Sequence, residues 1–88
     1  MKILIFNAIW CPSCLFMRPR FEKVFSSYDV VEYDYDLNND LVIKYNIGKI
    51  IPVVIIFKDD VEIKRIIGEK SIKELESIIE DLKDENSL

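Results

Sequence analysis

The residues best suited to chemistry are Cys11 and Cys14, the two cysteines of the chain. They enclose Pro12 and Ser13, and a pair with this spacing at the start of a helix can close a small disulfide without unwinding the helix. Unpaired N–H groups and the dipole at a helix start favour a thiolate, the attacking species in thiol–disulfide exchange. The second thiol can then resolve the mixed disulfide. The pattern therefore indicates redox chemistry, with Cys11 as the nucleophile and Cys14 as the resolving thiol.

Other roles for the cysteine pair remain open. Half a zinc site is one, but zinc usually takes four protein ligands, and the chain has no histidine and no third cysteine. A metal or cluster would need ligands from a partner, so the sequence predicts no metal site within one chain. A structural disulfide and two buried free thiols are the remaining alternatives. The absence of histidine also excludes Ser-His and Cys-His catalysis.

Composition limits the class of protein. The chain has 88 residues, 50% hydrophobic and 32% charged, which fits a single globular domain over 1–88. Its net charge of -4 makes it a poor partner for nucleic acid, and no apolar run approaches the length of about 18 residues that spans a membrane. Two close cysteines suit a reducing compartment. We therefore expect a cytoplasmic monomer that binds neither nucleic acid nor membrane.

The elements that position the cysteines follow from the hydrophobic pattern. Residues 3–6 form a continuous apolar run, typical of a central strand covered on both faces. From Cys14 to Tyr28, apolar residues recur at helical spacing. Pro12 suits the first turn of this helix, whereas Pro19 lies inside it and should kink or break it.

The rest of the chain predicts five further elements. We expect a strand at 30–33, a short helix within 37–45, strands at 53–58 and 61–67, and a final helix over 72–82 that frays at 84–88. Asp59 and Asp60 form the turn between the last two strands, and Ser71 and Glu74 have capping-box spacing. The predicted fold is α/β, in the order βαβαββα, with a mixed four-stranded sheet and three helices.

These residues resemble the thioredoxin superfamily, from about Lys2 to Leu82. Ala8 and Trp10 precede the first cysteine as in thioredoxins, and Pro19 matches the proline in the family's first helix. Ile51 and Pro52 resemble the family's cis-proline loop. Gly68 matches a glycine near the substrate groove. The resemblance therefore implies a thioredoxin-like fold.

The resemblance also implies a function. It implies a thiol–disulfide oxidoreductase that needs no bound cofactor and reduces disulfides in protein substrates. Electrons would come from a flavin-dependent thioredoxin-type reductase that uses NADPH, or alternatively from glutathione. The substrate-binding residues implied are Trp10, Pro12, Ile51, Pro52 and Gly68. Two further alternatives are a module that carries a metal or cluster with a partner, and a non-catalytic fold that docks partners in the groove.

The chain departs from the family pattern at several positions. Thioredoxins usually carry a buried acid where this chain has Ile5; Glu32 on the next strand either substitutes for it or is solvated. Glutaredoxins have a tyrosine in the motif and a Thr-Val-Pro loop, where this chain has Ser13 and Ile50-Ile51-Pro52. Lys49 is the nearby cation that could support glutathione binding. We therefore expect an apolar groove, lined by Trp10 and the two isoleucines, that favours protein segments.

Overall fold

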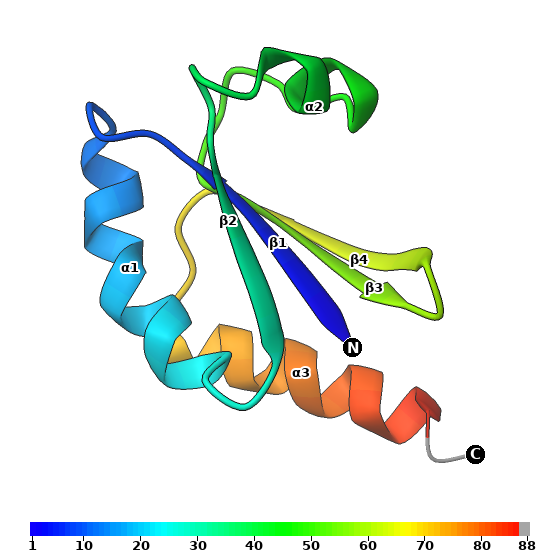
Figure 1. Cartoon of the computed structure of the whole chain (residues 1–88). Coiled ribbons are helices and arrows are strands. Elements are labelled where there is room, and N and C mark those ends of the chain that lie inside the picture. The colour runs from blue at the N-terminus through cyan, green and yellow to red at the C-terminus, as the bar shows by residue number, and fades with distance from the viewer. Residues whose placement is uncertain (87–88) are drawn as a thin grey trace.

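Seven helices and strands form the fold in the predicted order (Figure 1). The computed structural model describes residues 1–86, with side chains described as far as Lys83. The helical backbone continues to Asn86, so the fraying predicted over 84–88 does not occur at 84–86, and its remaining part lies outside the described residues. The elements are β1 (Lys2–Asn7), α1 (Pro12–Val24), β2 (Asp29–Asp34), α2 (Asn39–Lys44), β3 (Val53–Lys58), β4 (Val61–Ile67) and α3 (Ile72–Asn86).

The four strands form one mixed sheet in the order β2-β1-β3-β4. β1 pairs with β2 in parallel, so that Ile5 lies opposite Glu32, and it pairs antiparallel with β3. β3 and β4 form the antiparallel hairpin. Both Asp59 and Asp60 in its turn have positive φ values, 52° and 65°. Because asparagine and aspartate tolerate this region better than most residues, the turn forms without the favoured glycine.

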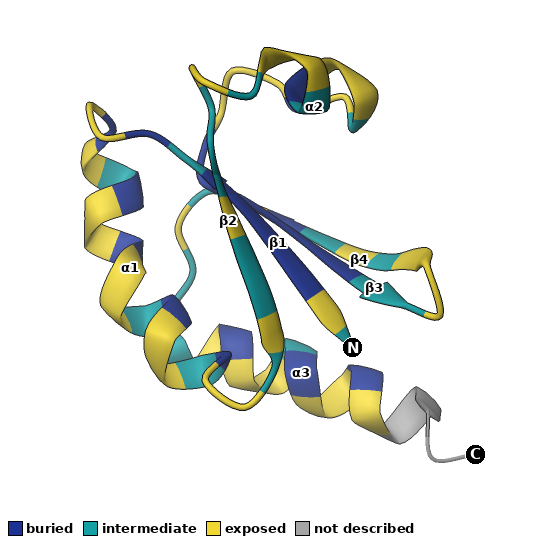
Figure 2. Ribbon diagram, in the orientation of Figure 1, coloured by how far each residue is buried: buried dark blue, intermediate teal, exposed yellow. Residues whose placement is uncertain are grey.

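The sheet is covered on both faces, as the apolar run of β1 predicts. Alternate residues of a strand point to opposite faces. Ile3 and Ile5 join a core with α1 and α3, whereas Leu4 and Phe6 join a second core with Val42 of α2. Figure 2 shows β1 buried along most of its length, with the exposed faces of the helices turned outward. This two-sided burial holds the end of β1, and the cysteines after it, in place.

The helix that carries the cysteines runs unbroken through Pro19. Cys11 is its N-cap residue and Pro12 its first residue, where a proline leaves no helical hydrogen bond unmade. Cys14, Met17 and Phe21 face the sheet and are buried. Of the two expectations for Pro19, a kink or a break, the break does not occur, because packing of this apolar face offsets the lost hydrogen bond.

The predicted capping box at the start of α3 is confirmed. The Glu74 N–H donates to the Ser71 hydroxyl at 3.1 Å, and the Ser71 N–H donates to the Glu74 carboxylate at 3.2 Å. These bonds from Ser71, the backbone one first, lower the pKa of Glu74. The pairing satisfies two backbone donors that the helix leaves free.

Replacing Ser71 with alanine should therefore destabilise the protein by about 1 kcal/mol. For a domain of this size, that corresponds to a loss of roughly 4–8 °C in Tm, measurable by circular dichroism. Because the pKa of Glu74 is lowered on folding, its contribution is present above the ordinary value of 4.5 and is lost as the pH falls through the lowered value. The difference between the two proteins should shrink in acid. Ser77→Ala, on the exposed side of the same helix, is the control; an equal loss there would contradict the cap.

Candidate active site

Cys11 lies where the loop after β1 turns into α1. Its N–H donates to the Ala8 carbonyl at 3.2 Å, which closes the loop. Its sulfur accepts a hydrogen bond from the Cys14 N–H at 3.2 Å and so caps the helix. A donor aimed at a sulfur at a helix start stabilises negative charge there. The local sequence thus places Cys11 where a thiolate is best supported.

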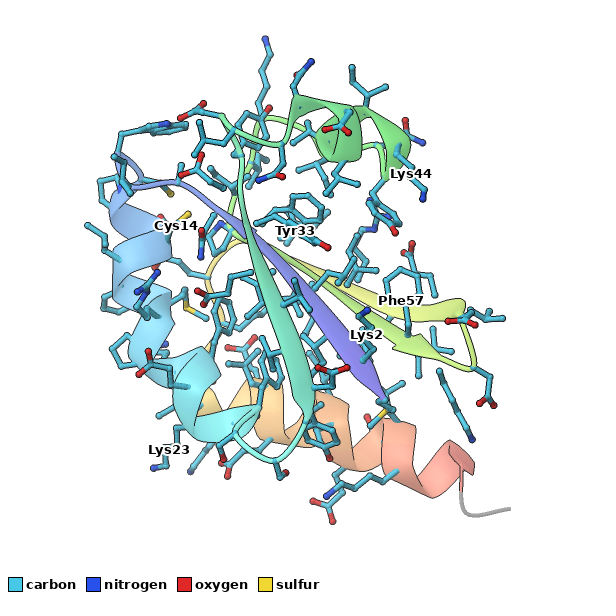
Figure 3. All side chains as sticks on the ribbon, in the orientation of Figure 1. Lys2, Cys14, Lys23, Tyr33, Lys44 and Phe57 are labelled. Atoms are coloured by element: carbon cyan, nitrogen blue, oxygen red, sulfur yellow. The ribbon has the colours of Figure 1, made fainter. Side chains whose placement is uncertain are left out.

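Cys14 lies one turn into α1, with its side chain at the N-terminal end of the helix (Figure 3). Burial raises the pKa of the Cys14 thiol to about 12, and its hydrogen bond with Cys11 adds to the effect. Both cysteines are free thiols, and each residue is 5% exposed. In the structure the two thiols differ in their hydrogen bonds and surroundings rather than in exposure.

The loop before β3 faces Cys11. The Ile51–Pro52 peptide is cis, as the resemblance predicted. The Cys11 thiol lies 3.7 Å from the Ile51 carbonyl oxygen, to which it can donate. On the other side of the loop, the Gly68 N–H donates to the Pro52 carbonyl at 2.9 Å, and Gly68 has a φ of 82°, which glycine adopts without strain. The loop before β3 therefore contacts the dithiol through Ile51 and the end of β4 through Pro52.

The rim of this site is apolar, but not as the sequence predicted. Ile51 was expected to line the groove, yet its side chain is buried at 6% exposure in the core with α2. Because the side chain turns inward, Ile51 presents its carbonyl to the site. Exposed apolar residues at this end of the sheet include Trp10, at 58%, Ile50, at 67%, and Ile67, at 49%. Ile67 was missed because alternation marked it only as the end of a strand.

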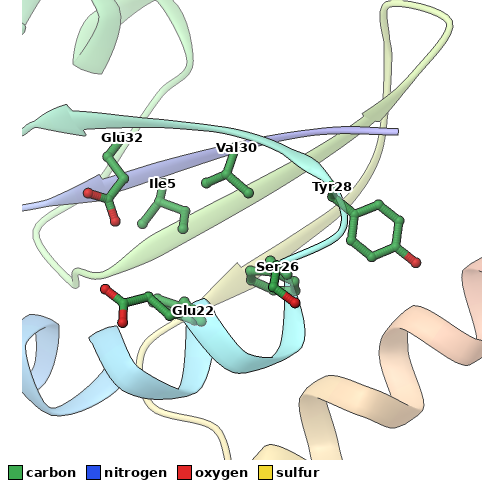
Figure 4. A pocket seen from close by; sticks show the side chains of 8 residues that line it. Ile5, Glu22, Ser26, Tyr28, Val30 and Glu32 are labelled. Atoms are coloured by element: carbon green, nitrogen blue, oxygen red, sulfur yellow. The ribbon is translucent and has the colours of Figure 1, made fainter.

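Glu32 is the one acid on β2 that lies in register with Ile5. It is exposed, and its carboxylate forms an ion pair with Arg18 at 3.6 Å. Figure 4 shows Glu32, Glu22 and Ile5 around a pocket of about 280 Å³ between α1 and β2. A paired and solvated carboxylate fits the second of the two interpretations offered by the sequence. The position of the family's buried acid is thus occupied by an apolar side chain.

Two acidic residues near the motif were missed by sequence analysis. The Trp10 indole Nε1–H donates to the Asp36 carboxylate at 2.5 Å, and the Ser13 hydroxyl donates to the Glu69 carboxylate at 2.6 Å. Asp36 follows β2 and Glu69 follows β4. Because β1, β2 and β4 run in the same direction, both acids lie at the same end of the sheet as Cys11. The signal available in the sequence was that each acid lies two residues after the end of a strand.

Comparison with known proteins decides the family. The Thioredoxin family model matches residues 1–81. The chain belongs to the thioredoxin family. It is 28% identical to the thioredoxin of Staphylococcus epidermidis (strain ATCC 35984), over 90% of this chain and 79% of that protein.

Solved thioredoxin structures agree with this assignment. Thioredoxin 1 from Thermosipho africanus TCF52B superimposes with a TM-score of 0.88 at 27% identity, and all of both chains is covered. Reduced thioredoxin from Schistosoma mansoni gives a TM-score of 0.77 at 29% identity, over 91% of this chain and 76% of that chain.

The family and the fold establish a thioredoxin-like thiol–disulfide oxidoreductase with Cys11 and Cys14 at Cys-x-x-Cys spacing. Membership implies protein disulfides as substrates and a reductase as partner.

Within residues 1–83, no three metal-binding side chains of the kinds His, Cys, Asp and Glu come together. In the part of the chain that the structure describes, no helix combines the length and apolarity needed to span a bilayer.

Proposed function

We propose that this thioredoxin-family protein reduces disulfides in protein substrates, with Cys11 as the nucleophile and Cys14 as the resolving thiol. The observation that carries the assignment is the hydrogen bond from the Cys14 N–H to the Cys11 sulfur at 3.2 Å. It stabilises a charged Cys11 sulfur, whereas burial keeps Cys14 protonated. Attack therefore begins at Cys11, and Cys14 holds its proton until it is needed.

The two steps balance without a cofactor. The Cys11 thiolate attacks one sulfur of the substrate disulfide, so that a mixed disulfide forms and the other substrate sulfur leaves as a thiolate. Cys14 then gives up its proton and attacks the Cys11 sulfur, which releases the second substrate thiol and forms the Cys11–Cys14 disulfide. The substrate gains two electrons, and a reductase must return two electrons to the protein.

Substrate binding rests on five residues around the dithiol. Trp10 and Pro12 are exposed on one side of Cys11. Pro52 and the Ile51 carbonyl form the opposite side, beside Gly68. An extended substrate segment that lies along this loop can pair with backbone groups, as in strand addition. The apolar exposed side chains on this side favour such a segment over a charged tripeptide.

The proposal also covers the state of the protein, its compartment and its electron donor. The protein acts as a monomeric single domain over 1–88 in the reducing cytoplasm, and a flavin-dependent thioredoxin-type reductase that uses NADPH returns its electrons. Glutathione is the second candidate for that role, because Lys49 lies next to the exposed Ile50 and could pair with a carboxylate of the tripeptide.

The test is insulin reduction with two electron sources in parallel. One arm contains NADPH and thioredoxin reductase, and the other contains glutathione, glutathione reductase and NADPH. We expect turnover in the first arm and little in the second. Turnover only with glutathione would replace the proposed partner. No insulin reduction in either arm, together with metal in the anaerobically purified protein, would favour the metal-carrying alternative.

A further inference from the structure

A carboxylate from a distant loop is fixed against the dithiol motif. Ser13, between the two cysteines, donates its hydroxyl proton to Glu69 Oε2 at 2.6 Å. Glu69 lies in the loop between β4 and α3, far from the motif in sequence. A direct contact of this length between two side chains places the Glu69 charge in the first turn of α1, at the residue that lies between the two cysteines.

The backbone on both sides of Glu69 is also held. The preceding Gly68 donates to the Pro52 carbonyl at 2.9 Å, and the carbonyl of the following Lys70 accepts a hydrogen bond from Arg20 at 2.8 Å. The residue before Glu69 is thus bonded to the cis-proline loop, and the residue after it is bonded to α1. A substrate that lies along Pro52 and Gly68 passes this carboxylate next.

Among the described side chains, residues 1–83, no salt bridge joins the Glu69 carboxylate to a cation. The salt bridges found within residues 1–83 join Arg18 to Glu32 and Arg65 to Glu62. The Glu69 carboxylate instead accepts a hydrogen bond from the neutral Ser13 hydroxyl. Two cations of this region, Arg20 and Lys70, act on Glu74, whose pKa they help to lower after the larger effect of its bonds with Ser71. A negative charge thus stays at the edge of the groove, on a chain whose net charge is already -4.

We propose that Glu69 is a specificity-determining residue that favours disulfides with a positive charge beside the reacting sulfur and disfavours anionic ones. The proposal rests on the proposed function and names its substrate class: protein disulfides with a lysine or arginine next to the attacked cysteine. The charge acts on encounter and on the complex before covalent attack. A single charge at the edge of the groove should change the rate for a cationic disulfide relative to an anionic one by about three- to tenfold. The change should be smaller at high salt.

Three small disulfides that differ in charge test the proposal. Reduced protein is mixed with an excess of cystamine, hydroxyethyl disulfide or dithiodiglycolate, which are cationic, neutral and anionic. The fluorescence of Trp10 follows the reaction, and mass spectrometry verifies the Cys11–Cys14 disulfide. Because the three reagents differ in intrinsic reactivity, the measured quantity is the ratio of the cystamine and dithiodiglycolate rates, compared between variants.

Glu69→Gln should lower this ratio by at least about threefold, and Glu69→Lys should lower it further. Glu76→Gln removes the same charge from the exposed side of α3, away from the motif, and should leave the ratio unchanged. The difference between wild type and Glu69→Gln should shrink in molar salt.

An equal change in all three rates with Glu69→Gln would overturn the proposal, because it would mean that Glu69 affects only the reactivity of Cys11. An equal drop in the ratio for Glu76→Gln would also overturn it, because net charge would then be the cause. If wild-type protein forms no Cys11–Cys14 disulfide with any of the three reagents, the proposed function itself fails, an outcome that no charge variant can mimic.

Discussion

Replacing Cys11 with serine should abolish insulin reduction, with a loss well over about a thousandfold, which is typical when a nucleophile is removed. The reason is that the Cys11 sulfur alone combines a helix-start position, a hydrogen bond from the Cys14 N–H and a place against the Ile51 carbonyl. Turnover is measured with NADPH and thioredoxin reductase. Circular dichroism establishes that the variant is folded.

Cys14→Ser should lose turnover too, but by a different route. Attack by Cys11 survives, resolution does not, and the variant should accumulate as a mixed disulfide with its substrate. Non-reducing electrophoresis and mass spectrometry detect the adduct, and Cys14→Ala controls for the serine hydroxyl. Adducts on Cys14 in the Cys11→Ser variant, with none in Cys14→Ser, would reverse the two roles.

The sequence was a good guide where one local pattern dominates. The apolar run of β1 predicted burial on both faces, because no polar alternation competes with it. Ser71 and Glu74 predicted the start of α3 through an exchange of hydrogen bonds within one turn. The cis form at Pro52 came from resemblance, since an isolated X-Pro bond favours trans.

Sequence was a poor guide where loops from different strands meet. The side chain of Ile51 is buried because the loop before β3 packs against α2, and no spacing rule shows this. The contacts of Ser13 with Glu69 and of Trp10 with Asp36 join residues whose distance depends on how the strand ends converge. Pro19 shows that tertiary packing can keep a helix continuous at a residue whose local preference is to kink or break it.

Alkylation of Cys14 should be slow at neutral pH even with Cys11 removed. Burial is the largest cause that raises the pKa of Cys14 from 9.0 to about 12, and it persists in Cys11→Ala. Below pH 9, the thiolate fraction falls tenfold for each unit by which the pKa is raised. The full shift would therefore make Cys14 react with iodoacetamide about a thousandfold more slowly than a thiol whose pKa is 9.0. We expect a somewhat smaller effect in this variant, because the contributions of Cys11 are lost.

The pH profile separates a raised pKa from restricted access. Restricted access lowers the plateau rate without moving the midpoint, whereas a raised pKa moves the midpoint itself. In native Cys11→Ala the rate of alkylation should still rise above pH 9. In guanidinium the midpoint of the same protein should return to the ordinary thiol pKa of about 9.0. A native midpoint at or below 9 would contradict the assignment of burial as the cause.

The causes of the raised Cys14 pKa also explain why Cys14 reacts after Cys11. Two of the causes that raise the pKa of Cys14, its hydrogen bond with Cys11 and the charge of Cys11, come from a free Cys11 sulfur. Both vanish once that sulfur is bonded to a substrate. The pKa of Cys14 should therefore fall when the mixed disulfide forms, which is when Cys14 must become the attacking thiolate. A midpoint for Cys11→Ala that lies above 9 and below about 12 is the expected signature of this coupling.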